Sequence, residues 1–480
     1  MNQRAGGRRQ EAGLAEGRKA ADLPETVAVL GFARSGRALA EALAARGVAV
    51  SVGDNRAAAE FDDLDALKAL GVRFFFGGPP PEFLDNADWL AVSPGVPLDV
   101  APVRSARGRG IPVLSEIEIA FRIAETETPG RHRWVAVTGT NGKSTTTTWI
   151  AEILKRAGRP VALAGNIGAP LSGFLAEPGP RDFVCEVSSF QLEAVDRFHP
   201  HVAVLTNITP DHLDRYADFD AYAAAKARLF ARQEAGDFAV VNADDPRSRA
   251  VATRARRVPF SRRGRPPGAA AGAWLEAGEL VSDVQPPRHA VVAADRLALP
   301  GAHNLENALA ALAAAECLGV PRAAVVGALT QFEGLPHRSE LVAEGGGVRW
   351  VDDSKGTNVD ATAKSLEGHA RGTVLLILGG RDKHGDFAAL RDLVRVNARA
   401  VLTIGEAAPV IERALDGAAP LESCGTLGEA VARAAGLARP GDTVLLSPAC
   451  ASFDQYRNYE ERGRHFAALA RATARGSHGT

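Results

Sequence analysis

The chain has 480 residues, a length that suits about three domains with cores of their own. Hydrophobic residues make up 46% and charged residues 24%, and the net charge of −1 gives no electrostatic reason to expect a nucleic acid or an acidic membrane as partner. The four cysteines lie far apart without a C-x-x-C pair, so neither a zinc site nor a disulfide framework is indicated. No apolar run is long enough for a membrane helix. We therefore expect a cytoplasmic globular protein that neither inserts into a membrane nor binds nucleic acid.

Residues 1–22 begin with "MNQRAGGRRQEAGLAEGRKA", which is rich in Arg, Gly and Ala. A secretory signal needs an apolar central segment, and this stretch has none. We expect these residues to form a disordered extension before the first domain.

The first ordered elements are expected at residues 26–54, "TVAVLGFARSGRALAEALAARGVAVSVGD". A β-branched run meets a Gly-rich turn, an Ala/Leu helix pattern follows, and a second strand ends at Asp54. This order predicts a βαβ unit of a dinucleotide-type fold. Gly31 and Gly36 do not complete G-x-G-x-x-G, so this turn alone is weak support for NAD binding. Strand-like runs at residues 89–97 and 110–116 extend the parallel sheet.

A polar stretch with Pro and Gly at residues 124–133 precedes the second part. There, "VAVTGTNGKSTTTTWI" combines a β-rich run, a glycine-rich turn, Gly-Lys-Ser and a helix-like stretch. The strict phosphate loop G-x-x-x-x-G-K-[ST] would need glycine at Val137, whereas Gly139 comes two positions later. Strand–turn–helix geometry still offers backbone N–H groups to a polyphosphate, with Lys143 near the terminal phosphates and Ser144 or Thr145 near Mg²⁺. A chance Gly/Thr-rich turn is the alternative, and we favour ATP binding.

Three further positions are candidates for chemistry. Glu186 ends an apolar strand in "CEVSSFQLE", so it is either a metal ligand or a strand-end acid paired with a local base. His212 in "NITPDHLDRY", beside Asp211 and Asp214, is either a metal ligand or an ordinary loop histidine, and Mg²⁺ prefers oxygen ligands. Lys226 lies among alanines in a helix pattern, which by itself is typical of a surface lysine.

Strands and helices alternate over the rest of the chain. The basic, Pro/Gly-rich residues 254–274 lack a recognisable nucleic-acid-binding module, and we expect a solvated excursion there. A helix is expected at residues 301–319, and a third α/β segment follows residues 332–340. The pattern predicts an α/β protein of three domains at residues 23–121, 122–334 and 335–480. The N-terminal and C-terminal domains are expected to be Rossmann-like, and the central one to be a P-loop mononucleotide-binding α/β ATPase domain.

Several motifs occur in the order and rough spacing of one family. They are "TGTNGKST", "GNIG", "EVSSFQLE", "TPDHLDRY", the helix-borne Lys226, "NADD", "GAHNLENALAA", "HR" and "DDSKGTN". From about Thr26 almost to its C-terminus the chain resembles the Mur ligases, the ATP-dependent amino-acid ligases of peptidoglycan precursor synthesis. In that family "GTNGKST" is the phosphate loop. Residues 445–466 resemble the branch that adds D-glutamate, and the D-N-P-R segment typical of the diamino-acid branch is absent.

The resemblance implies a two-step reaction in cell-wall construction, on which cell shape and cell division depend. ATP would phosphorylate the carboxylate of UDP-N-acetylmuramoyl-L-alanine, and the amino group of D-glutamate would attack the acyl phosphate. Because two anions must meet, the site needs concentrated positive charge. The implied cofactors are ATP and two Mg²⁺ ions, with Lys226 carbamylated so that it offers an oxygen ligand. We expect a monomer.

The resemblance also implies an ATP site shared by the second and third domains, which would close on binding and exclude water. The implied catalytic residues are Lys143, Glu186, His212 and Lys226, and the implied metal ligands are Ser144, Glu186, His212 and Lys226. The implied nucleotide contacts are Gly139, Thr140, Asn141, Gly142, Lys143, Ser144, Thr145, Asn304, Asn307, Arg338 and, on the ribose, Asp353.

The implied substrate contacts form three groups. The uracil and diphosphate would meet Arg34, Ser35, Asp54, Asn55, Arg56, Ser93 and Gly95. The sugar side would meet Asn166, Ser188 and Gln191. D-glutamate would meet Lys355, Thr357, Lys383, Ser452, Phe453 and Tyr459. Arg34 stands where relatives often have a small or apolar residue, and Tyr459 stands for a phenylalanine.

Three alternatives stay open. A sister Mur ligase would add another amino acid, and residues 445–466 separate the two. A phosphate-loop kinase or mechanical ATPase predicts a strict loop and no nucleotide-sugar domain. A non-catalytic nucleotide-sugar binding protein would not need Lys143.

Overall fold

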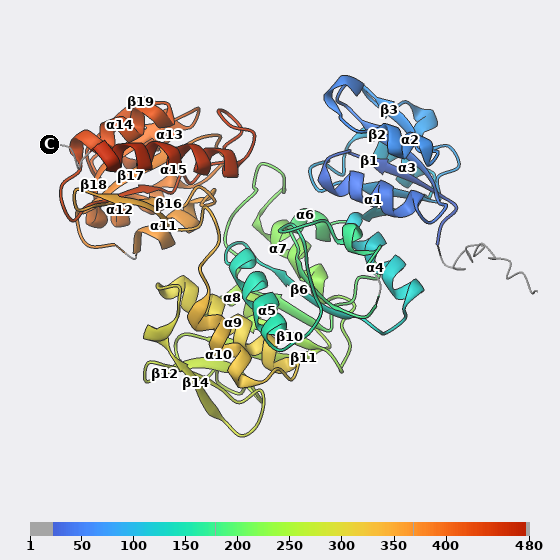
Figure 1. The fold of residues 1–480 in the computed structure, drawn as a ribbon, viewed down its shortest axis with the longest axis horizontal. Helices are drawn as coiled ribbons and strands as arrows, with labels where there is room; N and C mark the ends of the chain where they lie inside the picture. The colour runs from blue at the N-terminus through green and yellow to red at the C-terminus, as the bar shows by residue number, and fades with distance from the viewer. Residues whose placement is uncertain (1–22, 178, 368, 477–480) are drawn as a thin grey trace, which may run out of the picture. The chain divides into compact units, whose positions relative to one another are not determined.

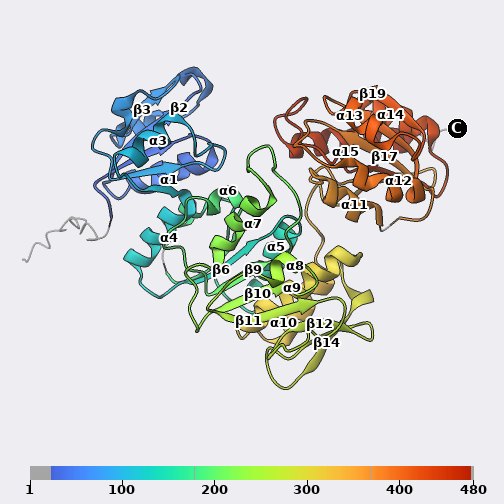
Figure 2. The same ribbon diagram turned by 180° about the vertical axis from the view of Figure 1, so that it is seen from behind.

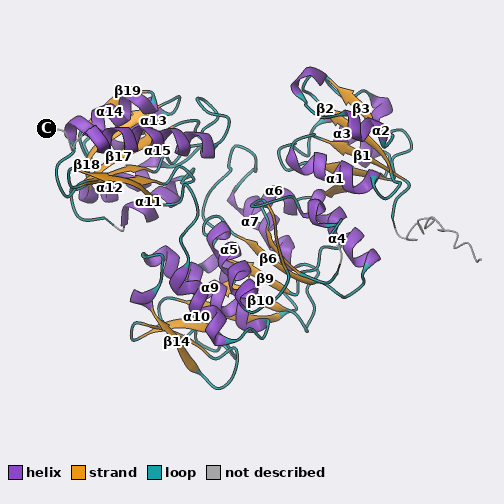
Figure 3. Ribbon diagram, in the orientation of Figure 1, coloured by secondary structure: helices purple, strands orange, loops and turns teal. Residues whose placement is uncertain are grey.

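The computed structural model describes residues 23–177, 179–367 and 369–476, so the extension expected at residues 1–22 lies outside the described residues. The chain divides into two compact units, Met1–Gly130 with Ser172–Pro178 and Arg131–Leu171 with Gly179–Thr480. Each unit consists of β-sheet flanked by helices (Figure 3).

The first unit contains a five-stranded sheet in the order β3-β2-β1-β4-β5, and all of its strand pairs are parallel (blue in Figure 1). Its strands are β1 (Thr26–Leu30), β2 (Ala49–Asp54), β3 (Arg73–Phe76), β4 (Trp89–Val92) and β5 (Val113–Ser115). Its helices are α1 (Arg34–Ala44), α2 (Asp65–Ala69), α3 (Ala101–Gly108) and α4 (Glu116–Glu127), with 3₁₀ turns at Ala58–Glu60 and Pro81–Leu84. Alternate residues of β1 pack against the apolar face of α1, which buries Val27, Val29, Leu39 and Leu43. Because β2, β1 and β4 are neighbours, the loops after them meet at one edge.

Helix α4 contains the domain boundary that we expect between residues 121 and 122. Ile119 and Ile123 on this helix pack into the core of the first unit. The domain limits at residues 121 and 334 stay predictions.

The second unit begins with a nine-stranded sheet in the order β14-β13-β12-β11-β10-β9-β6-β8-β7. Its strands are β6 (Arg133–Thr138), β7 (Val161–Gly165), β8 (Asp182–Glu186), β9 (Val202–Leu205), β10 (Phe238–Asn242), β11 (Arg256–Ser261), β12 (Ala273–Glu276), β13 (Glu279–Ser282) and β14 (His289–Ala293). Pairing is parallel from β7 to β12, and β13 and β14 are antiparallel additions.

Helices α5 and α9 lie side by side in both views (Figures 1 and 2) and, with β6, supply half of the buried residues in the core of this sheet. Val135 and Val137 of β6 and Trp149 and Ile153 of α5 are fully buried. The helices are α5 (Lys143–Arg156), α6 (Ser189–Leu192), α7 (Phe219–Ala227), α8 (Pro246–Arg249), α9 (Ala302–Cys317) and α10 (Arg322–Gln331), with 3₁₀ turns at Leu171–Phe174, Arg228–Phe230 and Ala294–Arg296.

Strand β11 (Arg256–Ser261) corrects the first part of our expectation of a solvated excursion at residues 254–274, whereas residues 262–271 lie outside any strand and are mostly exposed. It lies between β10 and β12, so it is an inner strand of the sheet. Val258 and Phe260 face the core and are almost fully buried, whereas Arg256 and Arg257 are exposed. Val258, Pro259 and Phe260 alternate in burial as in a half-buried strand, and the two exposed arginines before them obscured this short pattern.

The second unit also contains a six-stranded sheet in the order β15-β16-β20-β17-β18-β19, parallel except for β15 against β16. Its strands are β15 (Glu340–Gly345), β16 (Val348–Asp352), β17 (Val374–Gly379), β18 (Ala398–Ile404), β19 (Leu421–Gly425) and β20 (Thr443–Leu446). Its helices are α11 (Val359–Glu367), α12 (Arg391–Asn397), α13 (Ala408–Leu415), α14 (Leu427–Leu437) and α15 (Tyr459–Gly476), with a 3₁₀ turn at Phe387–Leu390. Three largely parallel sheets confirm the predicted three-part α/β class. Among the described residues, no helix has the length and apolar character needed to cross a bilayer.

Candidate active site

The loop between β6 and α5 is shaped by two glycines. Gly142 has a φ of +82°, and a Cβ there would lie 2.1 Å from Asn307 Oδ1. At Gly139 φ is +147°, and a Cβ would lie 1.9 Å from Thr206 Oγ1. Helix α5 begins at Lys143, so the free N–H groups of its first turn and the positive end of its dipole face this loop. The strand–loop–helix order is the one predicted from sequence, and it suits an anionic phosphate.

Two lysines converge on one carbonyl oxygen of this loop. Gly139 O accepts hydrogen bonds from Lys143 Nζ at 3.0 Å and from Lys226 Nζ at 2.7 Å. Lys226 is only 1% exposed, and its ammonium lies 4.5 Å from the centre of the Tyr222 ring. Burial, assisted by the charge of Lys143, holds the pKa of Lys226 well below its ordinary value. The structure thus places Lys226 inside the site and not on the surface.

Glu186 at the end of β8 is the acid of this group. Ser144 Oγ donates to Glu186 Oε2, and Asn166 Nδ2 donates to Oε1 at 2.7 Å. Burial raises the pKa of Glu186, but the cations around it, Lys143 foremost, outweigh burial and hold the pKa below its ordinary value. The carboxylate is therefore ionised beside a hydroxyl group.

His212 follows β9 in a left-handed conformation with a φ of +57°. Its ring lies 4.7 Å from that of Phe190, and burial lowers its pKa to about 3. The neighbouring Asp211 accepts hydrogen bonds from Lys383 Nζ at 2.8 Å and from Asn358 Nδ2 at 2.9 Å. A neutral imidazole therefore lies next to an ion pair that joins the two sheets of this unit.

Arg338 and Asp353 approach the loop from the side of the six-stranded sheet. Arg338 Nη2 donates to Ser144 Oγ at 2.6 Å. Asp353 follows β16 and accepts from Ser447 Oγ at 2.7 Å and from Ser339 N at 3.2 Å. Burial raises the pKa of Asp353 to about 6.

Helix α9 contributes two amide side chains. Thr146 Oγ1 donates to Asn307 Oδ1 at 3.4 Å, and Asn304 Nδ2 donates to Pro300 O at 2.9 Å. Both asparagines are buried, so α9 fixes polar groups against the first turn of α5.

The residues expected to meet D-glutamate come from three loops and the start of α15. Lys355 Nζ lies 4.0 Å from the centre of the Tyr459 ring, and burial lowers the pKa of Lys355 to about 8. Ser452 is buried, whereas Phe453 is 62% exposed. With Lys383, these groups form a cationic, partly aromatic wall.

One cavity of about 580 Å³ gathers most of the predicted residues of this unit. The predicted residues that line it are Thr140, Asn141, Gly142, Lys143, Thr145, Asn166, Glu186, Ser188, His212, Lys226, Asn304, Asn307, Arg338, Asp353, Lys355, Thr357, Lys383, Ser452, Phe453 and Tyr459. Gly139 and Ser144 contact lining residues through the bonds described above. Gln191 is not part of the lining, and its Oε1 accepts instead from Ser188 N at 2.9 Å as part of the cap of α6.

The predicted residues of the first unit gather at the edge formed by β2, β1 and β4. Asp54 Oδ2 accepts from Phe32 N at 2.7 Å and from Arg56 Nη2 at 3.0 Å. Burial raises the pKa of Asp54, but these hydrogen bonds outweigh it and lower the pKa. Ser93 Oγ donates to Gly31 O at 2.7 Å. Four further predicted residues lie in the same three loops or at the start of α1, namely Arg34, Ser35, Asn55 and Gly95.

Sequence reasoning missed several polar residues in or next to the cavity. Asn207 Oδ1 accepts from Asn141 N at 2.9 Å, and the carboxylate of Asp360 accepts from Asn141 Nδ2 at 2.6 Å. His303 on α9 also lines the cavity. Asn207 comes directly after a buried strand, a signal that could have revealed it, whereas nothing in the local sequence marks Asp360 or His303.

Comparison with known proteins identifies the family. Residues 25–115 match the family "Mur ligase MurD-like, N-terminal domain", residues 137–315 match "Mur ligase middle domain", and residues 337–450 match "Mur ligase, glutamate ligase domain". A protein of Anaeromyxobacter dehalogenans is 47% identical over 466 residues, which cover 94% of this chain and 98% of that protein. The chain belongs to the Mur ligases. The predicted resemblance is thereby confirmed.

Two relatives of this Mur ligase carry the same name. The protein of Anaeromyxobacter dehalogenans and one of Pelotomaculum thermopropionicum, 44% identical over 94% of this chain and 98% of its own length, are both called UDP-N-acetylmuramoylalanine--D-glutamate ligase. Among solved structures, a pseudomurein peptide ligase type C from Methanothermus fervidus is 20% identical with a TM-score of 0.57, covering 88% of this chain and 96% of that one. A UDP-N-acetylmuramate-alanine ligase from Thermotoga maritima is 19% identical with a TM-score of 0.54, covering 92% and 98%. These structures support the fold.

Proposed function

We propose that this Mur ligase is an ATP-dependent, ADP-forming enzyme that adds D-glutamate to UDP-N-acetylmuramoyl-L-alanine in peptidoglycan precursor synthesis. The observation that carries the proposal is the convergence of Lys143, Arg338, Lys355 and the ionised Glu186 on one cavity beside a phosphate loop. The name shared by the relatives supports D-glutamate as the incoming amino acid.

The chemistry explains why so many cations meet here. A substrate carboxylate oxygen must form a bond to the γ-phosphorus of ATP while ADP leaves. The amino nitrogen of D-glutamate then bonds to the acyl carbon, phosphate leaves, and the nitrogen loses a proton. Lys143 and Arg338 offset the repulsion between the two anions in the first step, which is mostly a matter of positioning and charge. Lys355 and Lys383 suit the two carboxylates of the incoming amino acid.

Magnesium fits the oxygen groups of the site. The hydroxyl of Ser144 and the ionised carboxylate of Glu186 touch each other, and both are groups that Mg²⁺ prefers. These two residues would hold one ion, and His212 with Lys226 would hold a second. When bound, the ions would neutralise charge on the phosphates and on the substrate carboxylate.

Carbamylation of Lys226 is part of this proposal. A buried lysine with a lowered pKa is the kind of amine that adds CO₂, since only the neutral amine is nucleophilic. We predict that Lys226→Ala loses activity and that acetate or propionate partly restores it, because a small acid replaces the lost carboxylate. Small amines, which would replace a cation, serve as the control. Rescue by amines and not by acids would contradict the carbamate.

The first unit would hold the uracil and diphosphate of the nucleotide sugar. The edge where Asp54, Arg56 and Ser93 gather supports this role, because ligands of open parallel sheets bind beyond the carboxyl ends of the strands. Asn166 and Ser188 would meet the sugar side. We further propose that the enzyme acts as a monomer in the cytoplasm.

The decisive variant is Lys143→Ala. We predict that it lowers ADP release at least about 1,000-fold, because the charge next to the transferring phosphate is lost, while UDP-sugar binding stays measurable. Lys155→Ala is the matched control, since Lys155 lies on the same helix, is half-exposed and forms its ion pair with Glu152. Phosphate release with UDP-N-acetylmuramoyl-L-alanine and a panel of D- and L-amino acids measures both turnover and specificity. Unchanged turnover in Lys143→Ala refutes the assignment, and a faster reaction with another amino acid indicates a sister ligase.

A further inference from the structure

The linker between α10 and β15 has an unusual backbone where it reaches the cavity. His337 has a φ of +63° and Ser339 a φ of +46°, a left-handed conformation that only a few per cent of non-glycine residues adopt. Each costs about 1–2 kcal/mol relative to ordinary backbone, so other contacts must hold them. Between them lies Arg338, whose guanidinium reaches Ser144 of the phosphate loop at 2.6 Å.

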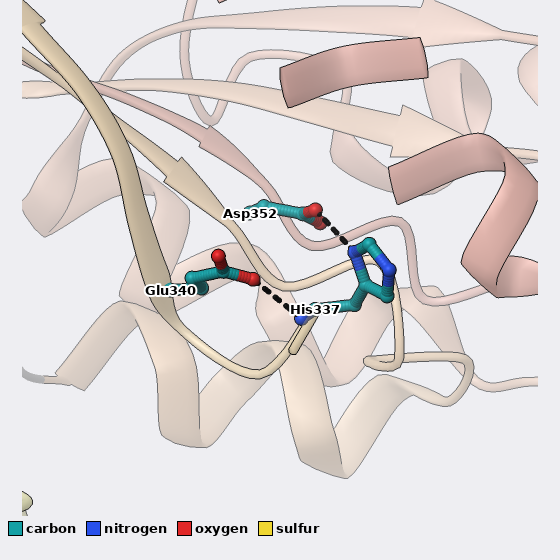
Figure 4. A group of neighbouring side chains, drawn as sticks. All are labelled: His337, Glu340 and Asp352. Atoms are coloured by element: carbon teal, nitrogen blue, oxygen red, sulfur yellow. Dashed lines mark hydrogen bonds and ion pairs between the residues drawn. The ribbon is translucent and has the colours of Figure 1, made fainter. Parts of the chain in front are cut away.

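His337 is held at three of its atoms (Figure 4). Its backbone N–H donates to Glu340 Oε2 at 2.9 Å, and its Nδ1 bonds Asp352 Oδ2 at 2.7 Å. Its carbonyl oxygen accepts from Lys355 N at 3.1 Å. On the other side of Arg338, Asp353 Oδ1 accepts from the N–H of Ser339. The linker is thus fixed to the end of β16 on both sides of Arg338.

The imidazole–carboxylate bond is enclosed. The Asp352 side chain is 0% and that of His337 12% exposed, and the hydrogen bond to Asp352 raises the pKa of His337. Helix α15 passes directly over the bond, because a Cβ at Gly463 would lie 2.2 Å from His337 Nδ1 and 2.7 Å from Asp352 Oδ2. Only a residue without a side chain lets α15 approach this closely.

We propose that His337 is a positioning residue: its imidazole, anchored on Asp352, holds the linker in the conformation in which Arg338 reaches the phosphate loop. The buried carboxylate of Asp352 would be costly without a partner, so its hydrogen bond to His337 is retained. That hydrogen bond in turn keeps the strained turn from relaxing. Relaxation would withdraw the guanidinium from the site of phosphoryl transfer. The inference rests on the proposed use of ATP.

A metal site is the alternative explanation of this cluster. His337, Glu340 and Asp352 have ligand atoms within 4.8 Å of one another, which would suit a divalent ion. However, Asp352 bonds the imidazole directly, and Glu340 is bonded to the backbone of the turn. These ligand atoms are therefore engaged in hydrogen bonds that hold the turn, and the cluster is better explained as an anchor.

The test separates the backbone of His337 from its side chain. His337→Gly permits the positive φ but removes the anchor, whereas His337→Asn tolerates the positive φ and keeps a nitrogen donor near Nδ1. We expect His337→Gly to lower kcat/KM for ATP about 10- to 100-fold, the usual cost of a misplaced group, and His337→Asn to stay within about threefold of the parent. The dissociation constant of ATP, measured without the other substrates, is expected to rise in the glycine variant.

Gly463→Ala places a methyl group of helix α15 against the His337–Asp352 hydrogen bond and should reproduce the effect of His337→Gly. Gly436→Ala in α14 is the matched control, because a Cβ there meets nothing within 4 Å. A cycle with Arg338→Ala decides whether His337 acts through Arg338: the double variant should be no worse than Arg338→Ala alone. Apparent melting temperatures show that the variants fold.

Three outcomes overturn the inference: parent-like activity and ATP affinity in His337→Gly, parent-like values in Gly463→Ala, or losses that multiply in the cycle. A parent that binds ATP without adding D-glutamate contradicts the proposed function, yet its ATP affinity still tests His337. A parent that binds no ATP contradicts both.

Discussion

Asp353 lines the cavity, and its buried charge lowers the stability of the folded protein. Its carboxyl is buried, and burial raises its pKa from 3.8 to about 6 although Ser447 and Ser339 donate to it. Because the folded-state pKa lies above the unfolded value, the proton binds the folded form more tightly. The charge therefore costs stability above about pH 6, and that cost fades as the pH falls from 6 to 4.

We predict that Asp353→Asn raises the apparent melting temperature at pH 7.5 by a few degrees, since about 2–3 kcal/mol of charge burial is removed. The gain should shrink below pH 6 and vanish near pH 4, while the KM for ATP rises because a proposed ribose contact is weakened. Asp352→Asn is the control, because Asp352 pairs with His337, and its loss should destabilise the protein. Scanning calorimetry from pH 4 to 8 measures the difference. A gain that is independent of pH would show that the Asp353 charge is not its source.

Arg462 illustrates what the sequence does not reveal at the residue scale. Its side chain is 1% exposed and donates to Ser354 O, Cys450 O and Ser354 Oγ at 2.9–3.1 Å. Within the described residues its hydrogen bonds go to a hydroxyl and to carbonyl oxygens and not to a carboxylate, and burial lowers its pKa to about 10. It ties together the loops that carry Lys355 and Ser452. An arginine in an Arg/Glu-rich helix start is typical of a surface residue, so only the fold reveals this role.

At the scale of elements, regular patterns predicted well. The β6–loop–α5 unit, the strand ending at Glu186 and helix α9 follow from apolar periodicity and glycine placement, and all three lie where the sequence indicates. The expectation of a solvated segment at Arg256–Ser261 was wrong, because exposed arginines and a proline masked the two buried positions of strand β11. The turn at His337 was not predictable, because its positive φ values depend on Glu340 and Asp352 and not on local propensity.

The candidate site was predicted largely from the family resemblance. Spacing alone did not decide whether Glu186 and His212 are metal ligands or ordinary structural residues, and it placed Lys226 on the surface. Burial of Lys226 beside the phosphate loop depends on α7 packing against residues more than eighty positions away. Local sequence patterns do not predict such long-range contacts. The known order of motifs in the family predicted the position of Lys226 where the local pattern did not.

At the scale of the whole molecule, the two sheets of the second unit are joined by polar contacts at the cavity. Lys383 and Asn358 bond Asp211, while Asp360 accepts from Asn141 and from Thr209. Lys383 is also expected to receive a carboxylate of D-glutamate. In this structure Lys383 is paired with Asp211, and we therefore expect the contact between the sheets and the proposed substrate contact to compete for one cation.

This competition predicts the effect of Asp211→Asn. The amide keeps an acceptor for Asn358 but gives up the ion pair, so Lys383 becomes available and the KM for D-glutamate should fall about three- to tenfold, the scale of a charge-assisted hydrogen bond. The kcat should fall as well, since one contact between the sheets is weakened.

Asp360→Asn is the matched control. Asp360 also joins the sheets but pairs with Lys364, so the KM of this variant for D-glutamate should stay unchanged. Steady-state kinetics at varied D-glutamate measure both constants. A KM that rises in Asp211→Asn would mean that Asp211 helps to bind the amino acid and does not compete with it, and the role of Lys383 would then have to be assigned anew.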